Sequence, residues 1–251
     1  MRTRPRGWRL AALITVSILI MCTGAAVALA LAILTLFQAR RAYTAIATGI
    51  GRVLLRLWGV RLVVSPRDAY PAGQVVYVSN HPSTLDLFIL VALGLPNTRF
   101  FLSGYLRWFG PLGVIAWLMG TFFTVPQDRP AERVRIFMRA ERILRRTRES
   151  VYLSPEGGRI PGGAIGPFNK GAFHLATALG APIVPLYFAI PPAVDPGMGY
   201  AIGSGTAVVH VKPPIDTRAW RTDEVGRRKE EVREMFVAWN HEARTEVRHA
   251  H

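Results

Sequence analysis

The 251-residue sequence has few of the residues that form cross-links or covalent intermediates. It contains one cysteine, Cys22, so one chain can form neither a disulfide nor a zinc site built of several cysteines. It also lacks a Gly-x-Ser-x-Gly segment, and no cysteine lies near His81, the candidate catalytic histidine described below. No covalent nucleophile is therefore evident. Lysine occurs only at positions 170, 212 and 229, so the positive charge is carried almost entirely by arginine.

Acidic residues are scarce as well. There are 16 Asp and Glu against 31 Lys and Arg, which gives a formal net charge of +15. Arginine suits planar, bidentate contact with phosphate. The excess therefore predicts an acidic partner, which is nucleic acid, an anionic membrane surface or an acidic carrier protein. The length fits one sizeable domain with an appendage, or two small domains.

Charge is absent altogether from residue 10 to residue 39. This run exceeds the roughly 20 residues needed to cross a bilayer and the ~7–15 apolar residues of a cleaved signal. It predicts a retained membrane anchor. A straight helix of this length would span about 45 Å against a hydrocarbon core of about 30 Å, so we expect it to tilt, or to bend near Thr23-Gly24.

Arginines flank the apolar run on both sides, which gives no clear orientation by the positive-inside rule. A hairpin with both ends in the cytoplasm would suit both flanks, and we favour it over a single span. The flanking residues are Arg2, Arg4, Arg6 and Arg9 before the run, and Arg40, Arg41, Arg52 and Arg56 after it.

Beyond the anchor, apolar strand-like runs alternate with amphipathic stretches. This alternation predicts an α/β domain with a largely parallel central sheet flanked by helices. The expected strands are 60–64, 74–79, 99–102, 151–153, 183–190 and 207–211, and the expected helices are 44–58, 82–90, 130–149, 170–179 and 224–247. A helix and a strand are expected within the second apolar region, 109–125. We divide the chain into an N-terminal segment (1–58), a core (59–217) and a C-terminal helical segment (218–251).

The first candidate site follows the expected strand 74–79, in the sequence SNHPSTLDLF. Pro82 suits the first position of a helix, so His81 would precede the helix and Asp86 would lie about one turn inside it. From there the carboxylate can reach one ring nitrogen, fix the tautomer and leave the other nitrogen as a general base. The alternative is that Asp86 stabilises the first helical turn and His81 is a capping or core residue.

A second candidate site, SPEGGR at 154–159, also follows an expected strand. Its glycines allow close approach of the backbone to a ligand, and Arg159 offers a guanidinium for phosphate. The alternative is an ordinary turn. Together, a base-like motif and a phosphate-like motif in a chain with a membrane anchor favour chemistry on a phosphorylated lipid.

The segment NHPSTLD, at 80–86, resembles the Asn-His-x4-Asp motif of the lysophosphatidic acid (1-acylglycerol-3-phosphate) acyltransferase family. SPEGGRI is similar to that family's Phe-Pro-Glu-Gly-Thr-Arg-Ser, and FNKGAF, at 168–173, to its Phe-Lys-Lys-Gly-Ala-Phe. IVPL, at 183–186, is similar to its fourth motif. The order and spacing match over roughly residues 60–214.

The resemblance implies the glycerol-3-phosphate acyltransferase-like fold and a reaction. His81, oriented by Asp86, would deprotonate a lysophospholipid hydroxyl, which would attack the thioester of acyl-CoA or acyl-acyl carrier protein. Neither metal nor redox cofactor is implied, nor is nucleic acid a partner. The site would lie on the cytoplasmic face of the inner membrane, against an anionic lipid surface. Its predicted substrate-binding residues are Asn80, Glu156, Gly157, Gly158, Arg159, Lys170 and Arg129.

Departures from the family pattern leave the acceptor open. Gly158 replaces a threonine, and Pro126 falls where the second motif has arginine, a role that Arg129 would have to take over. A lyso-ornithine lipid or another lysolipid is therefore an alternative acceptor. Two other classes remain, namely a thioesterase and a non-catalytic basic protein that binds lipid or nucleic acid. The arginine stripe at 135, 139, 142 and 146 fits a solvated helix face or a docking face for anionic lipid or carrier protein.

Overall fold

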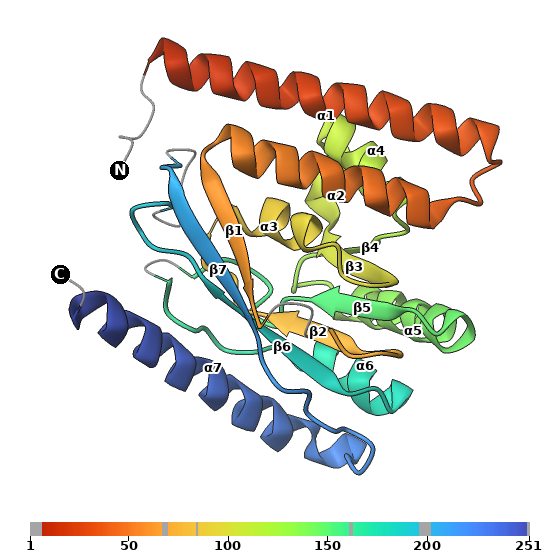
Figure 1. The fold of residues 1–251 in the computed structure, drawn as a ribbon. Coiled ribbons are helices and arrows are strands. Elements are labelled where there is room, and N and C mark those ends of the chain that lie inside the picture. The colour runs from red at the N-terminus through yellow and green to blue at the C-terminus, as the bar shows by residue number, and fades with distance from the viewer. Residues whose placement is uncertain (1–6, 67–69, 84, 161–162, 196–201, 250–251) are drawn as a thin grey trace.

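The computed structural model describes residues 7–66, 70–83, 85–160, 163–195 and 202–249; Arg2, Arg4 and Arg6 of the basic flank lie outside these ranges. Within the described ranges the strands form one seven-stranded sheet in the order β1-β7-β6-β2-β5-β3-β4 (Figure 1). The strands are β1 (Val60–Ser65), β2 (Val76–Ser79), β3 (Thr98–Ser103), β4 (Phe122–Thr124), β5 (Ser150–Leu153), β6 (Ile183–Ala189) and β7 (Gly205–Val211).

The direction of the strands decides where a site can form. All neighbouring pairs are parallel except β6 with β7, which confirms the predicted largely parallel sheet. The carboxyl ends of β2, β3, β4, β5 and β6 consequently meet along one edge. Ligands of open α/β sheets bind at this edge, outside the carboxyl ends of the strands.

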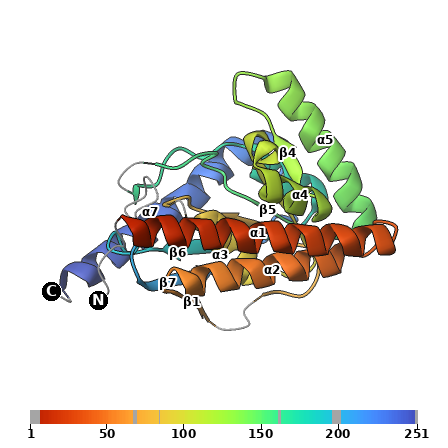
Figure 2. The same ribbon diagram turned by 90° about the horizontal axis from the view of Figure 1, so that it is seen from above.

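Helices cover both faces of the sheet (Figures 1 and 2). One face carries α1 (Trp8–Leu34), α2 (Arg40–Leu57), α3 (Asp86–Leu93) and α4 (Gly110–Leu118), with the 3-10 helix η1 (Gly104–Trp108). The other carries α5 (Pro130–Thr147), α6 (Gly171–Leu179) and α7 (Val225–His249), which the short η3 (Thr222–Glu224) precedes.

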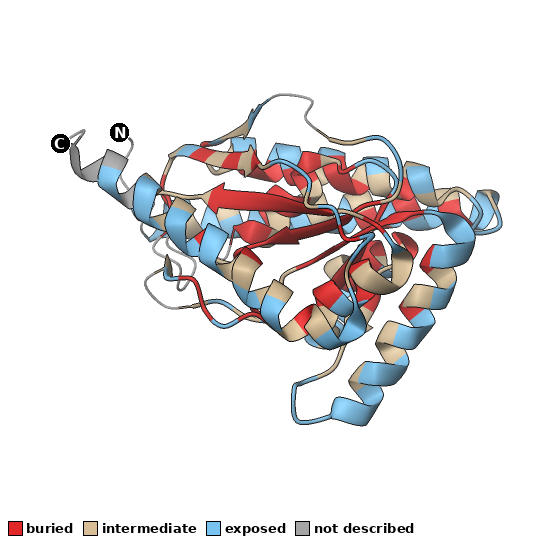
Figure 3. Ribbon diagram, turned by 90° about the horizontal axis from the view of Figure 1, so that it is seen from below, coloured by how far each residue is buried: buried red, intermediate tan, exposed pale blue. Residues whose placement is uncertain are grey.

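The hydrophobic core has two layers, one on each side of the sheet. Successive side chains of a strand point to opposite faces, so Tyr77 packs under the α2–α3 layer while Val76 and Val78 pack under α5–α7. The strands are accordingly the most buried part of the molecule (Figure 3). The segment boundaries predicted at residues 58 and 217 stay a prediction. Across these positions, α2 packs on β1 and α7 packs on β6.

The N-terminal apolar run forms α1, one uninterrupted helix, so the expected bend near Thr23-Gly24, or a hairpin turn between Trp8 and Leu34, is wrong, while the placement of both ends in the cytoplasm stays a prediction. The reason lies at Gly24, where the missing side chain lets α1 approach Ile50 of α2 closely instead of bending. Ala25, Ala28 and Ala32 are buried along the same side. Within the described part of the chain, α1 is the one helix long and apolar enough to cross a membrane, and most of its surface is exposed.

A buried ion cluster joins the N-terminal helices to the sheet. The carboxylate of Glu149, directly before β5, pairs with Arg40 of α2 and with Arg99 of β3. Both arginines also donate to carbonyls that follow α4, at Met119 (3.5 Å) and Gly120 (3.3 Å). Burial, with the nearby charge of Arg99, lowers the pKa of Arg40 to about 10. The cluster fixes α2 and α4 relative to the strands that carry the site.

Candidate active site

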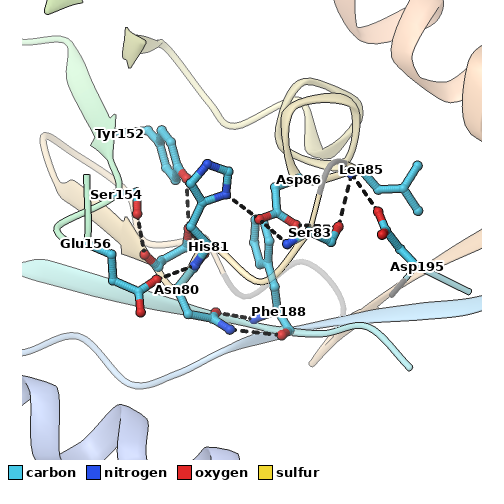
Figure 4. Close-up of polar contacts among 11 residues, drawn as sticks. Asn80, His81, Ser83, Leu85, Asp86, Tyr152, Ser154, Glu156, Phe188 and Asp195 are labelled. Carbon is cyan, nitrogen blue, oxygen red and sulfur yellow. Dashed lines mark hydrogen bonds and ion pairs between the residues drawn. The ribbon is translucent and has the colours of Figure 1, made fainter. Parts of the chain in front are cut away.

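The site begins where β2 ends. Asn80, the first residue after the strand, is buried and bonds the main chain of Phe188 in β6 at both ends of its side-chain amide. Its Oδ1 accepts the Phe188 N–H at 2.8 Å, and its Nδ2 donates to the Phe188 carbonyl at 3.1 Å (Figure 4). This pair continues the β2–β6 ladder by one step through a side chain, and it fixes the backbone from which His81 projects.

The turn between His81 and Asp86 differs from the sequence prediction, because α3 begins at Asp86 and not at Pro82. Side chains close this turn in place of helical main-chain bonds. Asp86 accepts the Ser83 N–H at 3.1 Å and the Ser83 hydroxyl at 3.0 Å. The Leu85 N–H is shared between Ser83 Oγ at 3.0 Å and Asp195 Oδ2 at 3.1 Å. Asp86 is therefore the first residue of α3 and does not lie one turn inside the helix, as the sequence predicted.

The imidazole and the carboxylate meet directly. His81 Nδ1 lies 2.6 Å from Asp86 Oδ2, and the Asp86 side chain is 5% exposed. The Ser83 N–H can only donate, so Asp86 acts as an acceptor and Nδ1 carries the hydrogen. The second ring nitrogen is then an acceptor, turned away from Asp86 (Figure 4). Burial raises the pKa of Asp86, while the hydrogen bonds from His81 and Ser83 oppose the rise.

The main chain of His81 is held by Glu156, which follows β5. Glu156 Oε2 accepts the His81 N–H at 2.6 Å, and Oε1 accepts the Gly166 N–H at 2.8 Å. Burial raises the pKa of Glu156 despite these two bonds. Each oxygen of the Glu156 carboxylate thus accepts one backbone N–H. The side chain thereby connects His81 to the loop that precedes α6.

A cavity of about 730 Å³ opens over the imidazole at the carboxyl edge of the sheet. One part of its wall is apolar, with Leu87, Leu90, Leu102 and Trp108 among the residues there. Another part carries cationic and amide groups, which are Arg107, Gln127, Arg129, Arg133 and Asn169. The cavity can therefore accept an amphiphile whose polar end is anionic and whose hydroxyl reaches His81.

Comparison with known proteins identifies the family. The acyltransferase family model matches residues 61–189, about half of the chain and including both motifs. The chain belongs to the acyltransferase family. The 1-acyl-sn-glycerol-3-phosphate acyltransferase alpha of Ovis aries is 30% identical over 193 residues, which are 76% of this chain and 67% of the relative. The corresponding enzyme of Escherichia coli (strain K12) is 28% identical over 173 residues, 68% and 69% of the two chains.

The fold of this acyltransferase is also that of a solved structure. The crystal structure of the 1-acyl-sn-glycerophosphate (LPA) acyltransferase PlsC from Thermotoga maritima matches with a TM-score of 0.73 at 18% sequence identity. The match covers 91% of this chain and 94% of that chain. The agreement confirms the predicted fold, with a central sheet flanked by helices and an apolar N-terminal helix.

The residues predicted to bind substrate fall in three places. Gly157 and Arg129 line the cavity above His81, and Gly157 has a φ of +71° that favours glycine. Lys170 lines a separate groove between α5 and α6. Gly158 and the exposed Arg159 follow Gly157 but are not among the residues found in the wall of the described cavity.

Several cavity residues were missed by the sequence interpretation. Arg133 lies one helical turn after Arg129 in α5, and its guanidinium donates to the Val125 carbonyl at 3.0 Å, which holds it at the cavity. The i, i+4 spacing of the two arginines was a usable signal. Arg107, Gln127 and Asn169 had none, because the short helix η1 and two loops bring them to the edge of the sheet. Within the described ranges, no three His, Cys, Asp or Glu side chains gather as a metal site.

Proposed function

We propose that this acyltransferase moves a fatty acyl group from a thioester donor, acyl-CoA or acyl-acyl carrier protein, to the free hydroxyl of a lysophospholipid. The proposed acceptor is 1-acylglycerol-3-phosphate and the product is phosphatidic acid. The observation that carries the proposal is the 2.6 Å contact between His81 Nδ1 and Asp86 Oδ2 beneath a cavity with arginines in its wall. The choice is supported by the similarity to 1-acyl-sn-glycerol-3-phosphate acyltransferases.

In the proposed mechanism, the unprotonated nitrogen of His81 takes the proton of the acceptor hydroxyl as its oxygen attacks the thioester carbon. Asp86 stabilises the imidazolium that forms. The carbon–sulfur bond then breaks, and the imidazolium returns its proton to the leaving thiolate. An ester and a free thiol result, and His81 is restored, so no covalent enzyme intermediate is required.

We assign two supporting tasks to the remaining residues. Asn80 and Glu156 hold the main chain on either side of His81, through Phe188 and Gly166. The acceptor's phosphate would be bound by Arg129 and Arg159, with Gly157 and Gly158 directly before Arg159 in the chain, whereas Lys170 lies in the groove between α5 and α6. Arginine suits this task because its planar guanidinium can form two bonds to one phosphate.

We further propose that the protein acts at the inner membrane, with its catalytic domain on the cytoplasmic face. The support is α1, whose apolar surface is largely exposed, together with a net charge of +15 suited to an anionic leaflet. Within the described residues of α2, exposed arginines at 41, 52 and 56 provide such charge beside α1.

The test is acyl transfer by membranes that contain the parent protein or His81→Ala. Labelled acyl-CoA or acyl-acyl carrier protein is supplied with 1-acylglycerol-3-phosphate, and separately with lyso-ornithine lipid. Phosphatidic acid formed by the parent alone supports the proposal. Equal activity of the variant refutes the role of His81. Free fatty acid without acylated lipid would indicate a thioesterase. Salt-sensitive nucleic-acid binding without acyl transfer would indicate the non-catalytic class.

A further inference from the structure

A second hollow opens beside the catalytic cavity, between α5 and α6. It encloses about 460 Å³. Its inner end shares Gln127, Arg133, Phe137, Asn169 and Gly171 with the cavity above His81. The two spaces therefore adjoin at these side chains, which places the α5–α6 groove next to the cavity that holds the imidazole.

The wall of the α5–α6 groove combines apolar and basic side chains. Val134 and Met138, on the groove side of α5, are 57% and 58% exposed, unlike Ala140 and Leu144 of the same helix, which are buried against the sheet. Lys170 and His174 line the groove on its α6 side. The acid of the groove, Glu141, is neutralised by Arg145 at 2.9 Å. Such a surface suits a slender ligand that has an uncharged stem and a phosphorylated end.

The position of the α5–α6 groove separates it from the lipid side. Helices α5 and α6 cover the face of the sheet opposite to α1, whose apolar surface is exposed (Figures 1 and 2). A lipid acceptor approaching from α1 would enter the catalytic cavity past its apolar wall at Leu87, Leu102 and Trp108. A water-soluble donor needs a route from the other face, and the α5–α6 groove supplies one.

We propose that the α5–α6 groove binds the phosphopantetheine arm of acyl-coenzyme A and delivers its thioester to His81. This inference rests on the proposed acyl transfer. The stem of the arm would lie along Val134 and Met138, and a phosphate at its outer end would meet Lys170. Coenzyme A is preferred to a carrier protein because its several phosphates match a small basic groove. A carrier would need a broad complementary surface around the groove.

The test compares two equivalent substitutions at exposed methionines in the full-length protein. Met138→Glu places a carboxylate in the α5–α6 groove, whereas Met235→Glu makes the same change on α7, where the side chain is 41% exposed. We expect the KM for acyl-CoA to rise roughly tenfold in Met138→Glu, from lost apolar contact and charge repulsion. The KM for the lysolipid should stay within about twofold, and Met235→Glu should behave as the parent.

A second comparison addresses the phosphate. Lys170→Gln should raise the KM for acyl-CoA by about threefold, as expected for one exposed ion pair. It should leave the KM for acyl-pantetheine, which has no phosphate, unaltered. An equal rise for both donors would overturn the assignment of Lys170 to a phosphate of coenzyme A.

Binding of a thioether analogue of acyl-CoA separates this inference from the proposed reaction. A parent that transfers no acyl group refutes the reaction, but the analogue still reports on the groove. The proposal expects roughly tenfold weaker analogue binding by Met138→Glu than by Met235→Glu. Equal binding by the two variants overturns it. A defect with acyl-carrier protein but not with acyl-CoA would also overturn it, in favour of a carrier contact.

Discussion

Substitution of Glu156 by glutamine tests whether this residue binds substrate or holds the catalytic base. The sequence interpretation placed it among the substrate-binding residues, whereas its two oxygens accept the N–H groups of His81 and Gly166 at 2.6 and 2.8 Å. Glutamine keeps the size of the side chain but has one acceptor oxygen and an NH2 group. One of the two backbone donors must then face another donor.

The magnitude follows from the cost of a buried, unsatisfied polar group, which is about 1–3 kcal/mol. If this cost is met by displacement of His81 from its reactive position, kcat falls roughly 5- to 150-fold. If His81 keeps its position and the buried group stays unsatisfied, the free energy of unfolding falls by the same amount. The KM for the lysolipid should hardly change in either case, because both carboxylate oxygens already accept backbone N–H groups and neither is left to bind the lysolipid.

The assay is steady-state acyl transfer with the lysolipid varied at saturating donor, accompanied by denaturant unfolding. Glu234→Gln, the same chemical change at an exposed position of α7, is the control and should match the parent in kcat and stability. A Glu156→Gln variant with parental kcat and a raised lysolipid KM would refute the reasoning and restore a direct role in substrate binding.

Three further predictions concern the same loops. Asp86→Asn should lower kcat about a hundredfold or more at unaltered lysolipid KM, because the amide no longer fixes the hydrogen on His81 Nδ1; steady-state kinetics check this. Gly157→Ala should cost about 1–2 kcal/mol in denaturant unfolding, since φ is +71° and the new Cβ would lie 3.0 Å from Asn169 Nδ2; a parental midpoint would contradict it. Burial raises the pKa of Glu156 in the folded state, so folding is favoured when this group is protonated. The stability advantage of the parent over Glu156→Gln should therefore be largest below about pH 4 and shrink as pH rises, as measured by unfolding from about pH 3 to 7.

Much of the fold could be predicted from the sequence. Short runs of β-branched and aromatic residues marked the strands, and the apolar faces of α5 and α7 marked helices that must pack on a sheet. The same signals located His81 after β2 and Glu156 after β5, and parallel strands bring their carboxyl ends together. The pairing of His81 with Asp86 followed from a spacing of five residues and is a local property.

The hydrogen bonds that hold the site could not be predicted from the sequence, for a physical reason. Glu156 and Asn80 bond to backbone groups of residues 75 and 108 positions away, and a main-chain donor leaves no signature in side-chain type. The first turn of α3 was misplaced because Ser83 and Asp195 satisfy donors that a helix would otherwise use. Gly24 was taken as a bend because close helix approach and flexibility both select glycine.

The bonds between Asn80 and Phe188 have a consequence for synthesis of the chain. They join residues 108 positions apart, and the ribosome synthesises Asn80 well before Phe188. At roughly 5–20 residues per second, His81, the proposed base, is synthesised about 5–20 s before the strand that fixes its backbone. Until β6 is made, the nascent chain holds β2 without the neighbour that completes its ladder. Its catalytic motif is present but unassembled during that interval, and activity begins only when the late strand inserts beside an early one.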